Sequence, residues 1–160
     1  ILEIASLVTD WDLEIVAEGP DIVISYSEDA LATMDQWSKK QHKASGLIER
    51  VLASPYDCHQ AEQETIRFLS SYTKKGSSPL CGNSVWQDRR FLLRHMPTLE
   101  AFFHYRNIDV STIKELVKRW YPSLPLFEKK KRHLALSDIK ESIRELKYYR
   151  EKVFTIMGRK

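Results

Sequence analysis

The sequence has few cysteines and no long apolar run. Cys58 and Cys81 alone cannot build a framework of disulfides, and no Cys-x-x-Cys pair indicates a zinc site. Two reduced thiols are typical of a cytosolic protein, so we expect a cytoplasmic location. No stretch approaches the ~18–20 apolar residues of a membrane span, and the first residues lack the basic segment of a signal peptide. We therefore expect no membrane association.

What is present is typical of an ordinary soluble globular protein. Hydrophobic residues make up 42% of the chain and charged residues 29%. A length of 160 residues fits one domain, so we expect residues 1–160 to form a single unit. The net charge of +3 permits an anionic partner but does not require one.

The order of predicted elements indicates an α/β fold. The predicted strands are 1–9, 13–26, 78–84 and 107–111. The predicted helices are 59–73, 85–96, 111–122 and 136–154, with short helical pieces within 27–55. The first two strands should form an antiparallel hairpin, with the second strand interrupted at Gly19 and Pro20. A mixed sheet with helices packed on it follows from this order.

Two helices carry clear local signals. Thr112 and Glu115 have the spacing of a capping box at the start of helix 111–122. Apolar periodicity predicts the buried faces of the two helices: Ile113, Leu116, Val117 and Trp120 in 111–122, and Ile139, Ile143, Leu146 and Val153 in the last helix.

Asp88 is a candidate metal ligand. It lies one turn into a helix that follows a strand, and ligands of open α/β sheets collect at the carboxyl ends of strands. A carboxylate there can bind a hard metal ion. The alternative is an acid favoured by the helix dipole, with Arg89 or Arg90 beside it.

His133 and Asp138 form a second candidate. A histidine just before a helix and an aspartate in its first turn can face one cleft, Asp138 as metal ligand and His133 as proton acceptor. The alternative is a helix start at which Ser137 is the cap and Asp138 is favoured by the dipole.

Aromatic residues supply further candidates. Trp37 lies in the polar context "MDQWSKKQH", where a nucleic-acid base can stack on an exposed ring, although a partly buried tryptophan fits as well. Tyr105 and Arg106 lie in the aromatic stretch "FFHYRNIDV". Both residue types are enriched at interfaces, so this stretch favours either core and rim or a dimer contact.

Taken together, these stretches resemble the oligoribonucleases, a group of the DEDDh 3′→5′ exonucleases with an RNase H-like fold. The resemblance is carried by "ILEIASLVTD", "MDQWSKKQHKASGL", "CGNSVWQDRRFL", "FHYRNIDVSTIKEL" and "HLALSDIKESIRELKYYR", in this order and over nearly the whole chain. The most specific parts are the His-x-Ala-x-x-Asp pattern ending at Asp138 and the Gly-Asn-Ser that precedes Asp88.

The resemblance implies degradation of short single-stranded RNA, down to dinucleotides, to 5′-mononucleotides by a homodimer that uses Mg²⁺ or Mn²⁺. It implies Asp88 and Asp138 as metal ligands and His133 as general base. It also implies substrate contacts from Trp37, His42, Ser84 and Gln87, and from Tyr105 and Arg106 of a second subunit.

One departure concerns the first motif of the family, Asp-x-Glu, which supplies two more metal-binding acids and lies upstream of the "ILEIASLVTD" strand. Neither it nor the first strand of the fold is within this sequence, and Glu3 lacks a partner acid at the required spacing. Because chains rarely start inside a strand, we expect residues upstream of Ile1. The alternative function is a catalytically impaired, nucleotide-binding homodimer of the same fold.

Overall fold

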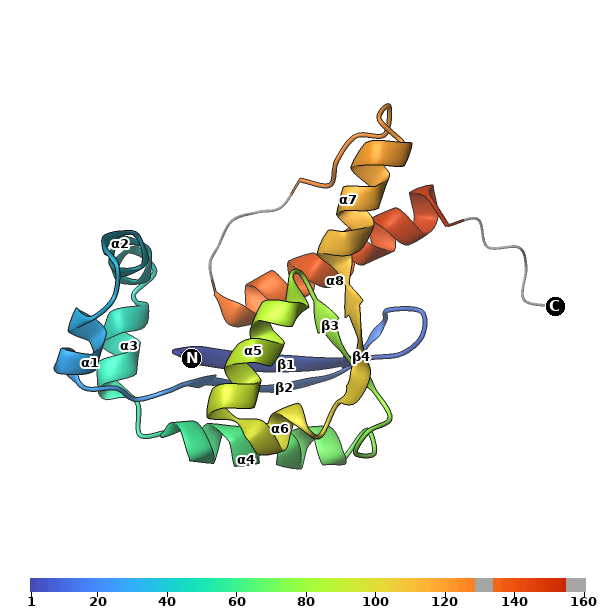
Figure 1. Ribbon diagram of the computed structural model, residues 1–160. Helices are drawn as coiled ribbons and strands as arrows, with labels where there is room; N and C mark the ends of the chain where they lie inside the picture. The colour runs from blue at the N-terminus through green and yellow to red at the C-terminus, as the bar shows by residue number, and fades with distance from the viewer. Residues whose placement is uncertain (129–133, 155–160) are drawn as a thin grey trace.

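A computed structural model describes residues 1–128 and 134–154. Within these ranges the strands are β1 (Glu3–Thr9), β2 (Ile15–Val23), β3 (Pro79–Gly82) and β4 (His104–Asp109). The helices are α1 (Glu28–Ala32), α2 (Gln36–Ala44), α3 (Leu47–Ala53), α4 (Cys58–Ser70), α5 (Val85–His95), α6 (Pro97–Glu100), α7 (Val110–Trp120) and α8 (Ala135–Lys152). In Figure 1, α4 runs below β1 and β2, and α8 runs above them. None of these helices is long and apolar enough to cross a membrane.

β1 and β2 form the predicted antiparallel hairpin, but the predicted interruption of β2 is wrong. The register shifts opposite Ser6, where Gly19 and Pro20 both stand against this one residue. Because Pro20 has no N–H to donate, the strand accommodates it in a bulge and then continues. Gly19 allows close approach of α4, since a Cβ atom there would lie 2.5 Å from the Phe68 ring.

The second pair of strands, β3 and β4, is parallel. β4 begins at His104, three residues before the predicted start, and Val110 and Ser111 belong to α7 rather than to the strand. Within the described ranges the two strand pairs are not hydrogen-bonded to each other. Antiparallel and parallel pairing with flanking helices agrees with the predicted α/β, RNase H-like architecture.

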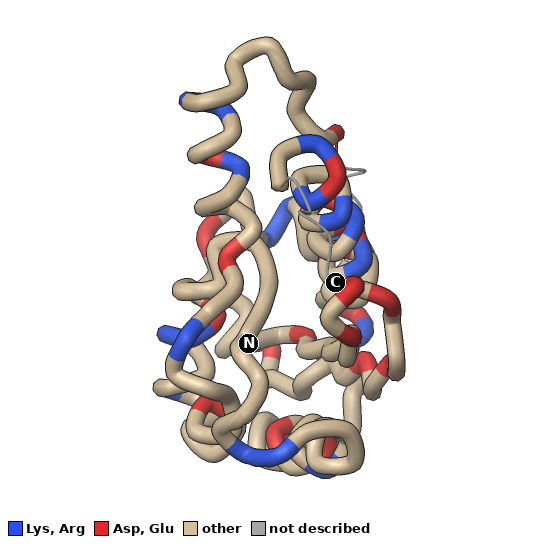
Figure 2. Tube along the Cα trace, turned by 90° about the vertical axis from the view of Figure 1, so that its right-hand side faces the viewer, with Lys and Arg blue, Asp and Glu red and all other residues tan. Residues whose placement is uncertain are grey.

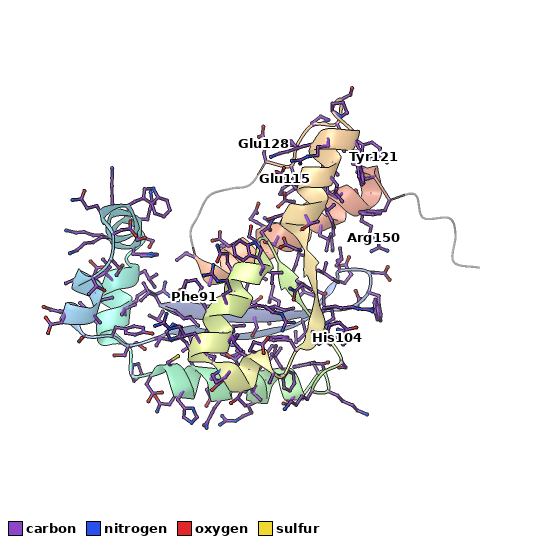
Figure 3. All side chains as sticks on the ribbon, viewed as in Figure 1. Phe91, His104, Glu115, Tyr121, Glu128 and Arg150 are labelled. Carbon is purple, nitrogen blue, oxygen red and sulfur yellow. The ribbon has the colours of Figure 1, made fainter. Side chains whose placement is uncertain are left out.

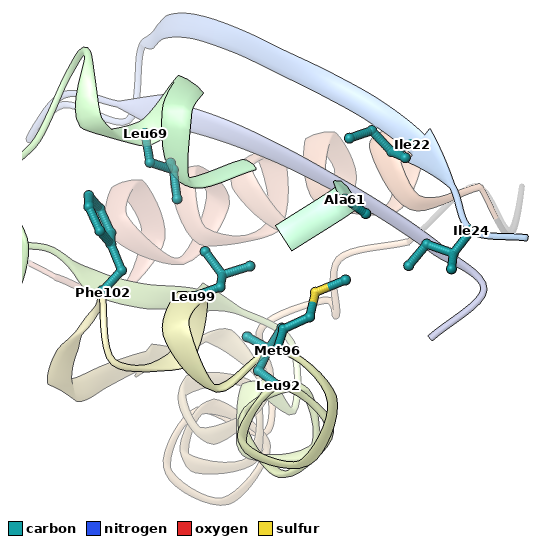
Figure 4. Close-up of a cluster of buried hydrophobic side chains, with 8 residues drawn as sticks. All are labelled: Ile22, Ile24, Ala61, Leu69, Leu92, Met96, Leu99 and Phe102. Carbon is teal, nitrogen blue, oxygen red and sulfur yellow. The ribbon is translucent and has the colours of Figure 1, made fainter. Parts of the chain in front are cut away.

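The main core lies between the hairpin and α4 on one side and α5 and α6 on the other (Figure 4). It contains Ile22, Ile24, Ala61, Leu69, Leu92, Met96, Leu99 and Phe102. Burying a large aliphatic side chain contributes about 1.5–3 kcal/mol, so this cluster holds α5 firmly against the hairpin. The helix that carries Asp88 is therefore anchored through Leu92.

The short helices α1 to α3 surround a second, smaller core. Leu31, Leu47 and Val51 are buried there and contact half-buried residues of the hairpin strands. Figure 1 shows these three helices at one end of the molecule, away from α7. An ion pair between Arg50 of α3 and Glu3 of β1 connects this group to the hairpin.

α7 differs from its predicted form at its start and on its apolar face. The helix begins at Val110, and its N-cap is Asp109, whose side chain accepts the Ser111 N–H; Thr112 is not the cap. Val117 is buried as predicted, but Leu116 and Trp120 are 36% and 67% exposed. Part of the predicted inner face is therefore surface.

α8 also departs from its predicted form. It begins at Ala135 with Leu134 as N-cap, so Ser137 is not the cap. Its buried residues are Glu141, Glu145 and Tyr149. The aliphatic residues predicted to face inward, Ile139, Ile143, Leu146 and Val153, are only half-buried. The periodicity of aliphatic residues pointed to the wrong face because the buried stripe of this helix is polar.

Ion pairs attach α8 to the hairpin. Their members are Lys140 with Glu18 (2.7 Å), Lys147 with Glu14 (2.7 Å) and Arg150 with Asp12 (2.5 Å). Figure 2 shows basic segments of α8 beside acidic segments of the hairpin, and Figure 3 places Arg150 next to the hairpin loop. Each exposed pair contributes little alone, but the set fixes which side of α8 faces β2.

Candidate active site

Asp88 lies in the first turn of α5, close to the carboxyl end of β3. β3 ends at Gly82, and the chain turns through Asn83 and Ser84 before the helix starts. Ser84 adopts a left-handed conformation with φ of 54°, which makes the turn tight. The Asp88 side chain is exposed. The structure thus confirms the predicted position of this acid after a strand.

The two arginines that follow Asp88 do not pair with it. Arg89 donates to Glu100 at 2.7 Å, and Arg90 lies over the Trp86 ring at 5.7 Å. Within residues 1–128 and 134–154, Asp88 forms no ion pair. Neither arginine is therefore an ion-pair partner of Asp88, but Asp88 does lie in the first turn of α5, where the helix dipole favours an acid.

The surroundings of Asp88 favour a cation. Desolvation by nearby protein atoms raises the pKa of Asp88, and the negative charge of Asp109 raises it further. A divalent cation at this carboxyl group would offset both effects, and Mg²⁺-like ions prefer carboxylate oxygens. In the part of the chain that the structure describes, no three His, Cys, Asp or Glu side chains are grouped to hold a metal ion. Asp88 is thus a suitable ligand but not a complete site.

Asp109 joins three elements around Asp88. Its carboxyl group accepts the N–H of Ser84 and the N–H of Ser111, both at 2.9 Å. The hydroxyl groups of Ser84 and Ser111 lie 3.2 Å apart. An open cavity of about 340 Å³ beside them is lined by these three residues and by Trp86, Thr112, Glu115, Leu116 and Arg119. The turn of Asn83 and Ser84 between β3 and α5, called the β3–α5 corner below, is therefore held rigidly against α7.

Asp138 lies in the first turn of α8, and its side chain is exposed. The start of this helix is held from the hairpin, since the Glu3 carboxyl group accepts the Ala135 N–H at 2.9 Å. Glu3 also pairs with Arg50, and its side chain is only 6% exposed. Glu3 is thus a cap supplied by β1 to the helix that carries Asp138. His133, the predicted base, lies outside the described residues.

A partly buried hydrogen bond connects α8 with the β3–α5 corner. The Asn83 amide donates to Glu145 at 3.0 Å and to the Ser111 hydroxyl group at 3.3 Å. Glu145 is fully buried. The helices that carry Asp88 and Asp138 are therefore linked through protein contacts at the carboxyl end of β3.

Four of the predicted substrate contacts lie on two separate elements. Trp37 and His42 are both on α2, where Trp37 is 67% exposed and His42 is half-buried. Ser84 and Gln87 are exposed at the start of α5, and Gln87 accepts a hydrogen bond from Arg90 at 3.2 Å. Among the described residues no hydrogen bond or ion pair connects α2 with Asp88, and Figure 1 shows α2 apart from α5.

Tyr105 and Arg106 lie on β4, next to His104, which Figure 3 labels. The Arg106 guanidinium group is 5.4 Å from the Tyr105 ring centre, and the His104 and Tyr105 rings are 4.3 Å apart. Tyr105 is 75% exposed. Arg89 holds this strand through a 2.7 Å hydrogen bond to Asn107. The stack is thus firmly presented to solvent and is not part of the core.

Sequence patterns did not predict that four residues hold the site together: Glu3, Asn83, Asp109 and Glu145. Asp109 had a usable signal, because an aspartate directly before a helix is a frequent cap. Glu145 had a weaker one, because Asp138, Glu141 and Glu145 share one helical face. Glu3 caps a helix that starts 132 residues later, and local sequence cannot predict a contact of this range.

The fold and the acids at strand and helix ends define a domain of the exonuclease class. The family model described as Exonuclease matches residues 1–146 of the chain.

Curated relatives narrow this class. An oligoribonuclease of Shewanella loihica is 60% identical over 157 residues, covering 98% of this chain and 87% of the relative. An oligoribonuclease of Dichelobacter nodosus is 58% identical over 154 residues, covering 96% and 85%. An oligoribonuclease of Shewanella amazonensis is 61% identical over 157 residues. The chain belongs to the oligoribonuclease family of exonucleases.

Proposed function

We propose that this protein degrades short single-stranded RNA, from oligomers of a few nucleotides down to dinucleotides, from the 3′ end to 5′-mononucleotides. Relatives named oligoribonuclease at about 60% identity over nearly the whole chain support the reaction class. The structural observation that carries the proposal is Asp88, an exposed carboxyl group beside a second acid, Asp109, with no ion-pair partner among residues 1–128 and 134–154.

Asp88 and Asp138 are the proposed ligands of Mg²⁺ or Mn²⁺. Their chemistry fits, because both are exposed carboxylates in first helical turns, and carboxylate oxygens suit hard cations. Divalent ions bound there supply Lewis-acid stabilisation of the phosphate undergoing cleavage. The protein's part is to hold the two carboxyl groups in a fixed relation, which α5 and α8 do through their shared contacts.

His133 is the proposed general base. In the sequence it stands five residues before Asp138 and two residues before Ala135, the first residue of α8. An imidazole with an unperturbed pKa of ~6.5 can accept a proton from the attacking water near neutral pH. The ring nitrogen that accepts this proton would then release it to solvent.

Substrate contacts are assigned to three groups of residues. Trp37 stacks on a base of the RNA, and His42, Ser84 and Gln87 contact its phosphates. Tyr105 and Arg106 of a second subunit close the 5′ end, which makes the homodimer part of the site. The exposed stack of these two residues supports this assignment, because such aromatic and arginine side chains are typical of contact surfaces.

We further propose that residues 1–160 form one exonuclease domain that acts in the cytoplasm. The family match over residues 1–146 supports the single domain, as does Tyr26, which packs against both the main core and the second, smaller core. The alternative of a non-catalytic nucleotide-binding dimer gains no support from the relatives, which are named as enzymes.

The proposal is tested with a 5′-labelled diribonucleotide and Mn²⁺. We expect Asp88→Asn and Asp138→Asn each to lower the cleavage rate by more than the ~10–100-fold effect of an outer-shell residue, and a chelator to abolish cleavage. Asp29→Asn is the matched control, because Asp29 is also an exposed acid in a first helical turn. Cleavage that survives chelation, or equal effects of all three variants, would contradict the proposal.

A further inference from the structure

Glu145 is a fully buried acid in the middle of α8, between α7 and the β3–α5 corner. Its carboxyl group accepts a hydrogen bond from the Asn83 amide at 3.0 Å and one from the Tyr149 hydroxyl group at 3.2 Å. The Lys114 ammonium group lies 3.5 Å away. Burial and the adjacent Glu145 raise the pKa of Tyr149 to about 12, so this tyrosine remains a donor.

Stability alone does not explain this arrangement. Burying a carboxyl group carries a desolvation cost that its partners only offset, and an apolar residue of similar size often serves stability equally well. The neighbouring buried stripe could accommodate such a residue, since Val110, Val117 and Tyr149 form an apolar cluster there. Unlike an apolar residue, a hydrogen-bonded acid fixes the relative orientation of the groups that the bond joins.

This orientation is relevant to the proposed metal ligands, because the Asn83–Glu145 hydrogen bond joins the elements that carry Asp88 and Asp138. Glu145 lies seven residues after Asp138 on the same face of α8, about 10 Å along the helix axis. Asn83 lies five residues before Asp88, in the turn that starts α5. The Asn83–Glu145 bond therefore fixes both the rotation of α8 and its distance from α5.

We propose that Glu145 is a positioning residue that, through Asn83, sets Asp138 relative to Asp88 so that both carboxyl groups can bind the same metal centre. This inference rests on the proposed role of these two acids as ligands. The inference concerns the hydrogen-bond acceptor at Glu145. Glutamine keeps an acceptor oxygen and should therefore preserve the positioning, whereas leucine has no acceptor and should not.

The test measures Mn²⁺ binding by calorimetry, without substrate. We expect Glu145→Leu to raise the Mn²⁺ dissociation constant about tenfold, the size found for outer-shell partners of metal ligands, and Glu145→Gln to restore it to within about twofold. Asn83→Ala removes the same bond from the other side and should have the effect of Glu145→Leu. The double variant should bind no more weakly than either single variant.

Glu62→Leu is the matched control. Glu62 is also a buried acid, 4% exposed, and it accepts the Leu99 N–H at 2.9 Å, away from α8. It should lose stability without losing Mn²⁺ affinity. Equal weakening by Glu62→Leu and Glu145→Leu, or a folded Glu145→Leu protein with unchanged affinity, would overturn the inference.

A wild-type protein that neither binds Mn²⁺ nor cleaves RNA would refute the proposed function. The positioning role of Glu145 can still be tested in that case by a measurement that needs no metal. Hydrogen exchange of the backbone amides of residues 87–89 in metal-free protein reports how firmly the start of α5 is held. Faster exchange in Glu145→Leu than in Glu62→Leu supports positioning by Glu145. Equal exchange in both variants rejects it.

Discussion

Two exposed tryptophans allow the proposed base stacking to be separated from general surface effects. Trp37 on α2 is 67% exposed, and Trp11 at the hairpin turn is 86% exposed. Stacking of one base on an aromatic ring contributes ~1–3 kcal/mol, so Trp37→Ala should raise KM for a diribonucleotide ~5- to 150-fold. Steady-state kinetics with Trp11→Ala as the control check this. Similar KM values for both variants would remove Trp37 from the site.

Single residues were predicted well from sequence where their role depends on local position. Asp88 could be placed because a strand, a Gly-Asn-Ser turn and a helix follow one another directly. The absence of an Arg89 or Arg90 partner could not be predicted, because Arg89 reaches Glu100 through the fold. The proximity of Asp109, which raises the pKa of Asp88, likewise depends on how β4 ends beside α5.

At the scale of the elements, the hairpin carries a group of acids that should make stability depend on pH. Desolvation raises the pKa of Asp21, and Glu3 and Glu18 raise it further, although Arg50 lowers it. The folded protein therefore binds the Asp21 proton more tightly than the unfolded chain, whose aspartates titrate near 3.9. This contribution to stability is present below that pH and is lost as pH rises through the raised pKa.

Asp21→Asn should consequently raise Tm at pH 7, and the difference from the wild-type protein should shrink as pH falls below about 4. Calorimetric melts of both proteins across this range measure the effect. A Tm difference that stays constant with pH would show that packing, and not the charge of Asp21, is responsible.

Elements were predictable where one signal dominated and less so where signals competed. The hairpin and α5 follow from alternation and from the stop at Pro97. For α7 the capping-box spacing of Thr112 and Glu115 was misleading, because Asp109 caps the helix one turn earlier. For α8 the half-buried isoleucines suggested an apolar inner face, whereas Glu141 and Glu145 are buried and Glu145 contacts Asn83 from a distant part of the chain.

At the scale of the whole molecule, exposed apolar residues support the proposed homodimer. Leu116 and Trp120 lie one turn apart on α7, and Leu116 lines the cavity that also contains Trp86. Such clusters on a protein surface mark contact sites. The sequence placed these residues in the core, because periodicity indicates which residues share a helix face but not whether the rest of the chain covers that face.

We expect light scattering to give the mass of two chains for the wild-type protein and of one chain for Leu116→Asp. Cleavage should fall with the loss of the dimer, because Tyr105 and Arg106 would no longer reach a second site. Leu52→Asp is the control, since Leu52 is a comparably exposed leucine, at 44%, on the distant α3. A one-chain mass for the wild-type protein, or a monomeric Leu116→Asp protein with full activity, would refute the assembly.

The bulge at Gly19 and Pro20 has a consequence for the behaviour of the protein in a crowded solution. Within the described ranges β2 pairs only with β1, so its outer edge is available to other extended chains. Pro20 offers no N–H, the bulge disturbs the spacing of donors and acceptors, and the charges of Glu18 and Asp21 flank it. A neighbouring chain therefore cannot add along this edge as a continuous strand, which disfavours aggregation through the edge of β2.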